Sequence, residues 1–509
     1  MSADPPVPSQ ERPIGQVRGT RDWLPSDFAA LAVLEGRLLD RFAMAGYEPL
    51  RTPVLEFTEL HERKSGAGIV SKLYEVADGS DQPLCLRPEL TASIVRAYTA
   101  AEDAPPSPWR VSMAGPVFRH EPRPRAGHYR EFHQVGVELL GASGPAFDGE
   151  AIWLADSALR AVGIEDATVR IGHVGLILEM LERSGLPAPA RSALVEMLSE
   201  AAAEGRDVGA LEQGLDQLAA WLRTTEGTEI PLPAEGDDPG VDRLFRTLMP
   251  VITGRRTGRE ILGRLRRKWD LGHSLLGVLE GVRTQVHELS SLRGPAADVL
   301  DRLDRDFRAL APSSIASLRE LLACLEAYGV RADRVTLDLG FGRGIGFYSQ
   351  MIFEWTVPTP GGPVEVCGGG RYDGLARVLG SDRDDRGVGF AFGLERLLRV
   401  LDARGLRPPP WPASGVLVWF SRFDASEAVR LAQAIRATGG RAVLDSTRNA
   451  DEAVAIARSL GLAAVASWAY PERDLAWVRR LANDTEDFLV GLNDEEIGFL
   501  ARRDPEGRR

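Results

Sequence analysis

Residues 109–141, WRVSMAGPVFRHEPRPRAGHYREFHQVGVELLG, give the strongest indication of the fold. Two apolar runs flank a polar loop in this stretch, and this pattern predicts two antiparallel strands joined by that loop. The loop carries a set of cationic and titratable side chains: Arg119, His120, Arg123, Arg125, His128 and Arg130. Because each guanidinium can donate two parallel hydrogen bonds, such a loop can fold over a polyphosphate. A solvated surface loop is the plain alternative.

The second strand of this pair has two unlike faces. Side chains alternate along a strand, so one face collects residues that are polar, aromatic or glycine: Phe132, Gln134, Gly136 and Glu138. The opposite face is mainly aliphatic. Glutamine and glutamate on either side of a glycine suit a pocket that receives an amine or an imidazole over the glycine, whereas a strand facing solvent is the alternative.

A glycine-rich run follows at residues 337–355, LDLGFGRGIGFYSQMIFEW. Glycines at alternate positions from 340 to 346 leave one strand face without side chains, so another group must approach the backbone closely. Arg343 lies among these glycines. A lone arginine in a strand usually forms an ion pair, but this setting favours contact with a ligand.

Two further segments carry glycine next to arginine. Residues 364–375, VEVCGGGRYDGL, place three glycines before Arg371 and Tyr372. Residues 387–401, GVGFAFGLERLLRVL, change from a strand pattern to a helix pattern and place Arg396 in the first turn of the helix. Backbone amides at a helix N-terminus favour an anion, so Arg396 is a candidate for phosphate binding. The alternative is an ordinary start of an amphipathic helix.

The composition of the chain limits what it can bind. Its 509 residues are enough for about three domains, and its formal charge is 61 − 73 = −12. This charge excludes a basic, histone-like nucleic-acid binder. The only lysines are Lys64, Lys72 and Lys268, and the other 58 basic residues are arginine. Contacts with anions must therefore come almost wholly from arginine.

Several classes of site are excluded by patterns that the sequence lacks. Cys85, Cys324 and Cys367 form no C-x-x-C pair, which excludes a disulfide framework and a cysteine-rich zinc site. Lys64 is the only lysine before Ser or Thr, and it follows arginine, so ATP would have to bind without a Walker loop. No apolar run approaches the length of a membrane span and the N-terminus has no signal-peptide core, so we expect a cytoplasmic protein with no membrane partner.

Changes in composition divide the chain into five parts. They are a polar arm (1–14), a core of mixed strands and helices (15–174 and 331–404), a helical insertion (175–330), a proline linker (405–414) and a small C-terminal domain (415–500). The pattern of the last part predicts β-α-β-α-β, with helices near 424–437 and 450–459.

Taken in this order, the segments resemble a class II aminoacyl-tRNA synthetase, specifically the histidyl-tRNA synthetase family. RGTRDWLPSD (18–27) resembles the family's opening, and GYEPLRTPVLE (46–56) resembles its dimer-interface motif, with Pro53 as the motif proline. LYEVADGSDQPLCLRPELTASIVRAY (73–98) resembles the family's substrate loop. VFRHE with GHYREFHQVGVELLG (117–121 and 127–141) resembles the second class motif, and GVGFAFGLERL (387–397) resembles the third. RGIGFY (343–348) and CGGGRYDGL (367–375) resemble the two histidine-specific motifs.

The resemblance implies a fold and a set of roles. The fold would be α+β, an antiparallel sheet flanked by helices with a helical insertion and a small C-terminal α/β domain like an anticodon-binding domain, assembled as a homodimer. The pocket for histidine would be formed by Glu89, Thr91, Gln134, Glu138, Arg343, Tyr348 and Tyr372. Arg119 would hold the α-phosphate of ATP, Glu121 with Phe132 the adenine, and Arg396 the γ-phosphate. Arg119 and Arg343 would be catalytic, stabilising charge together with Mg²⁺.

Two functions remain open on these grounds. The first is a histidine–tRNA ligase, which forms histidyl-adenylate from histidine and ATP and transfers it to tRNA(His); an adenylating enzyme without a tRNA substrate is a variant of it. The second is a non-catalytic relative, the histidine-sensing regulatory subunit of ATP phosphoribosyltransferase, whose partner is the catalytic subunit. Residues 121–124, 141–155 and 171–176 favour the second function. Gly346 and Phe347 replace an aspartate and a tyrosine usual in the family, which would weaken the orientation of histidine without abolishing it. Residues 411–509 also favour the second function, because they hold no lysine and a net charge of 13 − 15 = −2, which is poor for RNA binding.

Positive charge is nevertheless concentrated in the motif segments. We expect one site to bring together the arginines of these segments: Arg119, Arg123, Arg125, Arg130, Arg343, Arg371 and Arg396.

Overall fold

The computed structural model describes residues 14–65, 71–79, 81–103, 105–125, 127–186, 191, 194–195, 215–216, 275–341, 348–383, 386–408, 415–420, 425–446, 449–470, 475–481 and 487–491. The chain divides into two compact units. The large unit comprises Met1–Asp22 and Leu34–Leu406, and the small unit comprises Trp23–Val33 and Arg407–Arg509.

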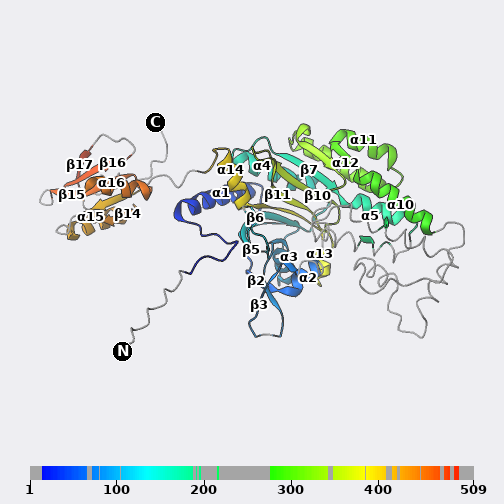
Figure 1. Ribbon diagram of the computed structural model, residues 1–509, viewed down its shortest axis with the longest axis horizontal. Coiled ribbons are helices and arrows are strands. Elements are labelled where there is room, and N and C mark those ends of the chain that lie inside the picture. The colour runs from blue at the N-terminus through cyan, green and yellow to red at the C-terminus, as the bar shows by residue number, and fades with distance from the viewer. Residues whose placement is uncertain are drawn as a thin grey trace, which may run out of the picture. The chain divides into compact units, whose positions relative to one another are not determined.

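The large unit is built on one nine-stranded sheet (Figure 1). The strand order is β1 (Glu48–Pro49), β5 (Trp109–Phe118), β6 (Glu131–Leu140), β12 (Gly387–Gly393), β11 (Val364–Arg371), β10 (Met351–Val357), β7 (Thr168–His173), β9 (Val335–Asp338) and β8 (Arg293–Pro295). All neighbours are antiparallel except β1 with β5 and β7 with β9. The expected fold class, a largely antiparallel sheet with flanking helices, is confirmed.

The predicted strand pair within residues 109–141 is confirmed as β5 and β6. Their register runs from Trp109 opposite Leu140 to Phe118 opposite Glu131. Val135 and Val137 are buried, as the aliphatic face of β6 requires. The arginine-rich loop therefore begins and ends at paired positions of these two strands.

Helices cover the main sheet of the large unit (Figure 1). The helices α4 (Pro145–Ala161) and α14 (Leu394–Ala403) contact β11, and α12 (Pro312–Ala327) packs on α4. The helix α1 (Pro25–Met44) has a buried stripe that includes Leu34, Leu38 and Phe42. The Phe42 ring meets the Phe390 ring of β12 edge-on, with centroids 5.7 Å apart.

A small three-stranded sheet positions one side of the site. Its order is β2 (Leu55–Phe57), β4 (Leu84–Leu86) and β3 (Tyr74–Val76), and it is followed or flanked by α2 (Thr58–Ser65), α3 (Thr91–Ala100) and α13 (Leu375–Val378). Apolar side chains of α3, including Ile94 and Tyr98, pack in one buried cluster with Val111 and Met113 of β5. This packing fixes the start of α3 relative to the main sheet.

Most of the predicted helical insertion (175–330) lies outside the described residues. Its described part contains α5 (Val174–Arg183), α10 (Leu275–Ser290), α11 (Ala296–Asp306) and α12, and also β8, which pairs with β9 in the main sheet. The expected domain boundaries stay a prediction. No helix among the described residues has both the length and the apolar character needed to cross a bilayer.

The small unit contains a five-stranded sheet. Its order is β14 (Ala442–Asp445), β13 (Val416–Trp419), β15 (Ala464–Tyr470), β16 (Leu475–Arg480) and β17 (Asp487–Gly491). The first three strands are parallel and, with α15 (Ala425–Ala437) and α16 (Ala450–Ser459), form the predicted β-α-β-α-β. The last two strands are antiparallel additions.

Candidate active site

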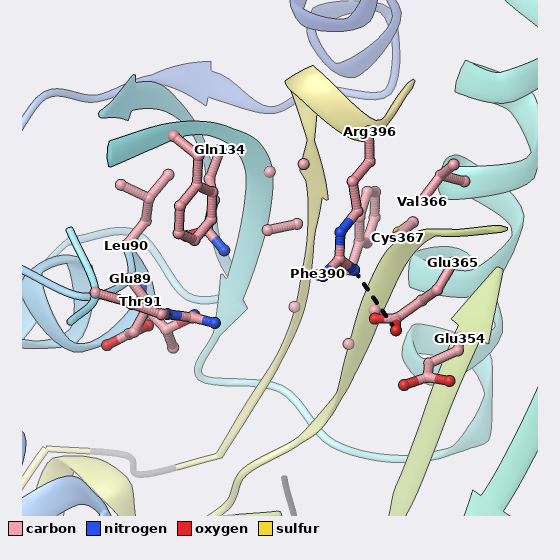
Figure 2. Close-up of a pocket in the computed structure, with 18 of the residues that line it drawn as sticks. Glu89, Leu90, Thr91, Gln134, Glu354, Glu365, Val366, Cys367, Phe390 and Arg396 are labelled. Atoms are coloured by element: carbon pink, nitrogen blue, oxygen red, sulfur yellow. Dashed lines mark hydrogen bonds and ion pairs between the residues drawn. The ribbon is translucent and has the colours of Figure 1, made fainter. Parts of the chain in front are cut away.

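A cavity of about 810 Å³ lies on the main sheet of the large unit (Figure 2). The predicted polar face of β6 lines it: Phe132, Gln134, Gly136 and Glu138. The strands β10, β11 and β12 and the start of α3 supply the other walls. The alternation of side chains along β6 therefore identified the correct face of this strand.

Glycines on two neighbouring strands make room for the acidic end of the cavity. Glu138 lies opposite Gly389 of β12, and Gly389 lies opposite Gly370 of β11. A Cβ atom at Gly389 would lie 1.8 Å from Oε2 of Glu138, and one at Gly370 would lie 2.8 Å from the Tyr348 ring. These glycines therefore leave the space that the carboxylate and the phenol occupy.

The glycine between Gln134 and Glu138 also meets a packing requirement. A Cβ atom at Gly136 would lie 2.2 Å from the carbonyl oxygen of Phe390 on β12. The close approach of β6 and β12 requires glycine here, and since Gly136 also lines the cavity, the expectation of a ligand seated over it stays a prediction.

Glu138 is held at the floor of the cavity by two hydroxyl groups. The Thr91 hydroxyl donates to Oε1 at 2.6 Å, and the Tyr372 hydroxyl donates to Oε2. Only 4% of Glu138 is exposed, and this burial raises its pKa to about 7, although both hydrogen bonds act to lower it. Gln134 lines the same cavity, and its buried Oε1 has no hydrogen-bond partner among the described residues. A carboxyl group that ionises near neutral pH in such a cavity suits a ligand that brings its own positive charge.

Glu89 has strong partners of its own at the start of α3. The backbone amides of Thr91 and Ala92 donate to it at 2.7 and 3.0 Å, so it caps the helix. Lys64 Nζ lies 2.9 Å from Oε2, and His61 Nδ1 lies 3.7 Å from Oε1. Burial raises the pKa of Glu89, but Lys64, His61 and these hydrogen bonds together lower it to about 2.

Two arginines also line the cavity. Arg119 Nε donates to the Pro88 carbonyl at 2.9 Å, and its guanidinium lies 5.2 Å from the centre of the Phe132 ring. Burial lowers its pKa, and among the described residues no carboxylate forms an ion pair with it. Arg396 Nε donates to the Gly127 carbonyl at 3.2 Å, which ties the arginine-rich loop to α14.

The remaining predicted residues are placed as follows. Tyr348 and Glu121 line the cavity, and Glu121 accepts a hydrogen bond from the Arg123 backbone amide at 3.0 Å. Arg343 lies outside the described residues, and β9 ends at Asp338, before the alternating glycines.

The expected convergence of arginines is only partly correct. Of the described members of that set, Arg119 and Arg396 line the cavity, and Arg123, Arg125, Arg130 and Arg371 do not. Arg371 is buried because its side chain turns to α4, where it pairs with Asp148 at 2.6 Å and donates to the Ala142 carbonyl at 3.0 Å. Its neighbour Gly370 faces Tyr348, so strand alternation sends Arg371 to the other side of the sheet.

Sequence reasoning missed several cavity residues: Lys64, Lys72, Glu354, Glu365 and Cys367. The scarcity of lysine was the available signal, because two of the three lysines of the chain line this one cavity. Within the described ranges, no group of three or more His, Cys, Asp or Glu side chains could hold a metal ion.

Comparisons with known proteins agree with this geometry. A family model described as histidyl-tRNA synthetase matches residues 19–230 and 240–397. The ATP phosphoribosyltransferase regulatory subunit of Moorella thermoacetica is 33% identical over 88% of this chain and 97% of its own length. The histidine–tRNA ligase of Pyrococcus horikoshii is 29% identical over 96% of this chain and its full length.

Solved structures show the same fold. The apo histidyl-tRNA synthetase of S. aureus superimposes with a TM-score of 0.62 at 22% identity, over 96% of this chain and 100% of that one. A protein of Bacillus halodurans, described as an ATP phosphoribosyltransferase regulatory subunit/histidyl-tRNA synthetase, gives a TM-score of 0.58 at 22% identity, over 88% of this chain and 96% of that one. Since the family model spans most of the sequence and the cavity carries the expected motif residues, this chain belongs to the histidyl-tRNA synthetase family.

Proposed function

We propose that this protein is a histidine–tRNA ligase that activates histidine with ATP and transfers it to tRNA(His). The observation that carries the proposal is that one cavity is lined by two unlike sets of side chains. Glu138, Thr91 and Gln134 form a set suited to a cationic side chain, and Arg119 with Arg396 forms a set suited to phosphates.

In the proposed reaction, a carboxylate oxygen of histidine attacks the α-phosphorus of ATP. An oxygen–phosphorus bond forms, the bond to the bridging oxygen breaks, and pyrophosphate leaves with the bond electrons. The protein supplies little covalent chemistry, so its contribution is positioning and charge stabilisation. Arg119 would neutralise the α-phosphate as charge shifts to the leaving group, with Arg343 and the Mg²⁺ of the nucleotide beside it.

The set proposed for histidine has the chemistry for selectivity. Histidine brings an ammonium group and an imidazole, which are both hydrogen-bond donors. Glu138, Glu89 and the Gln134 carbonyl oxygen are acceptors in the cavity wall, and the Tyr372 hydroxyl orients Glu138. A site built to accept such hydrogen bonds would discriminate strongly against amino acids that lack them.

The test is histidine-dependent exchange of labelled pyrophosphate into ATP. Replacing Arg119 by Gln should reduce the exchange rate by about 10²–10³-fold, because a charged donor to the reacting phosphate is lost. Arg123→Gln is the matched control, since Arg123 lies in the same loop but does not line the cavity, and it should exchange at the wild-type rate. Absence of histidine-dependent exchange in the wild type would contradict the ligase proposal.

A second function is favoured by a specific observation. The Moorella thermoacetica regulatory subunit matches over nearly its whole length, and residues 411–509 carry a net charge of 13 − 15 = −2. A regulatory subunit should bind histidine without pyrophosphate exchange, and should make ATP phosphoribosyltransferase activity sensitive to histidine. Exchange without aminoacylation of tRNA(His) would identify an adenylating enzyme with another acceptor.

A homodimer and a cytoplasmic location complete the proposal and follow from family membership alone. Light scattering on the eluted protein tests the first, and a monomer would contradict it. Cell fractionation tests the second.

A further inference from the structure

A carboxylate of the cavity wall lies in contact with the arginine proposed for phosphate binding. Glu365 is on β11 and lines the cavity, and its Oε2 lies 3.6 Å from Nη1 of Arg396 (Figure 2). Arg396 is anchored on its other side by the Gly127 carbonyl. Its guanidinium therefore already has a negative partner on the cavity side.

The same carboxylate acts on the second arginine. Burial lowers the pKa of Arg119 and the positive charge of Arg396 lowers it further, whereas the negative charges of Glu89 and Glu365 raise it. Glu365 thus lies within electrostatic reach of both guanidinium groups that would receive ATP.

Folding does not require this ion pair. The side chains of Glu365 and Arg396 are 28% and 33% exposed, and ion pairs with this much solvent contribute little to stability. The neighbouring Gly368 carries no side chain, and a Cβ atom there would lie 3.8 Å from Oε1 of Glu365, in ordinary van der Waals contact. The carboxylate of Glu365 therefore lies on the cavity wall, where it acts on any anion that approaches Arg396.

We propose that Glu365 is a specificity-determining residue that takes the place of a phosphate group beside Arg396, within electrostatic reach of Arg119, and competes with the nucleotide for these arginines. This inference rests on the proposed function, because it assumes that the cavity receives ATP. Glu365 weakens nucleotide binding and leaves histidine binding unchanged. It also selects the form of the nucleotide, since free ATP is more negative than its magnesium complex and is repelled more strongly.

The test is calorimetric titration of the full chain with three ligands: histidine, ATP in the presence of EDTA, and ATP with excess Mg²⁺. In Glu365→Gln, which keeps the shape of the side chain, Kd for free ATP should fall about fivefold. Kd for the magnesium complex should fall by a smaller factor, and Kd for histidine should stay within about twofold. The Glu365→Asp variant keeps the charge and should stay close to the wild type.

Glu320→Gln is the matched control, because Glu320 is exposed on α12 and does not line the cavity. It should bind all three ligands as the wild type does. An unchanged or weaker affinity of Glu365→Gln for free ATP overturns the inference, and weaker binding of the magnesium complex alone would make Glu365 a ligand of the metal instead. If neither the wild type nor Glu365→Gln binds ATP while both proteins bind histidine, Glu365 does not determine nucleotide binding and the inference also fails. Loss of histidine binding in the wild type would instead count against the proposed function.

Discussion

Lys64 is a buried cation that neutralises Glu89 in the wall of the cavity. The side chain of Lys64 is 2% exposed, and the pair is separated by 2.9 Å. The pKa of Glu89 falls from 4.5 to about 2, so the folded state gains stability above the unfolded pKa and loses it as pH falls from about 4.5 to about 2. Lys64→Met removes the main charge that opposes the burial of Glu89.

We therefore expect Lys64→Met to lower the free energy of unfolding at pH 7 by about 3 kcal/mol, measured by urea denaturation. Adding Glu89→Gln should restore part of this loss, since no buried charge then lacks a partner. Arg63→Met is the control, because Arg63 pairs with Glu59 on the exposed side of α2, and it should cost about 0.5 kcal/mol. Equal stability of Lys64→Met and the wild type would show that Glu89 does not depend on this lysine.

The pKa of Glu138 is shifted in the opposite direction, and it predicts a pH dependence of histidine binding. Burial raises its pKa to about 7, so the unliganded site carries a neutral carboxyl group below that pH and a carboxylate above it. Because histidine is cationic at its ammonium group, its affinity should increase as pH rises from 6 to 8. Titrating histidine across this range in Glu138→Gln should give a flatter profile, apart from the ionisation of the ligand itself. Tyr372→Phe removes a hydrogen bond that lowers the pKa of Glu138, and should move the midpoint above 7. A midpoint that moves down would contradict this assignment.

The sequence predicted the cavity face of β6 because side-chain alternation is local. It did not predict that Arg371 turns away from the cavity, because its partner Asp148 is 223 residues distant and belongs to another element. It also missed Glu365, since an isolated glutamate in a strand has no distinguishing pattern. Contacts between distant segments decide these positions, and one sequence does not display them.

At the scale of the elements, the packing of β6 against β12 depends on a glycine. Gly389→Ala would place a Cβ atom 1.8 Å from Glu138 Oε2, and the carboxylate would have to move from its two hydroxyl partners. We expect a loss of about 1–3 kcal/mol in stability, measured by thermal unfolding, together with loss of histidine binding. Gly361→Ala, in the turn between β10 and β11, is the matched control, because the nearest atom would be 3.9 Å away and Gly361 does not line the cavity, and it should bind histidine normally. Normal histidine binding by Gly389→Ala would show that the carboxylate position is not needed.

Long periodic elements were predictable and very short strands were not. The helices α15 and α16 lie where their patterns placed them. By contrast, β1 has two residues and β8 has three, which is too short for any alternation to be visible. The strand β8 lies within a stretch expected to be helical and pairs with β9 only because the chain returns to the sheet. Short edge strands depend on a neighbour that the local sequence does not specify.

For the whole molecule, a formal charge of −12 coexists with a cavity whose lining includes two arginines and two lysines among several glutamates. Small anions can be bound by such a local group of charges, but an RNA needs many phosphate contacts over a wide surface. If the protein is a ligase, we therefore expect it to make few phosphate contacts with tRNA(His). The binding constant for tRNA(His) should be obtained from aminoacylation assays between 50 and 200 mM salt. We expect its logarithm, plotted against the logarithm of the salt concentration, to fall with a slope of about −3 or shallower, since each phosphate contact contributes about 0.7–0.9 to the slope. Pyrophosphate exchange measured over the same salt range is the control, since it requires no RNA. A slope near −8 would show that arginines outside the cavity form an extensive RNA surface in spite of the net charge.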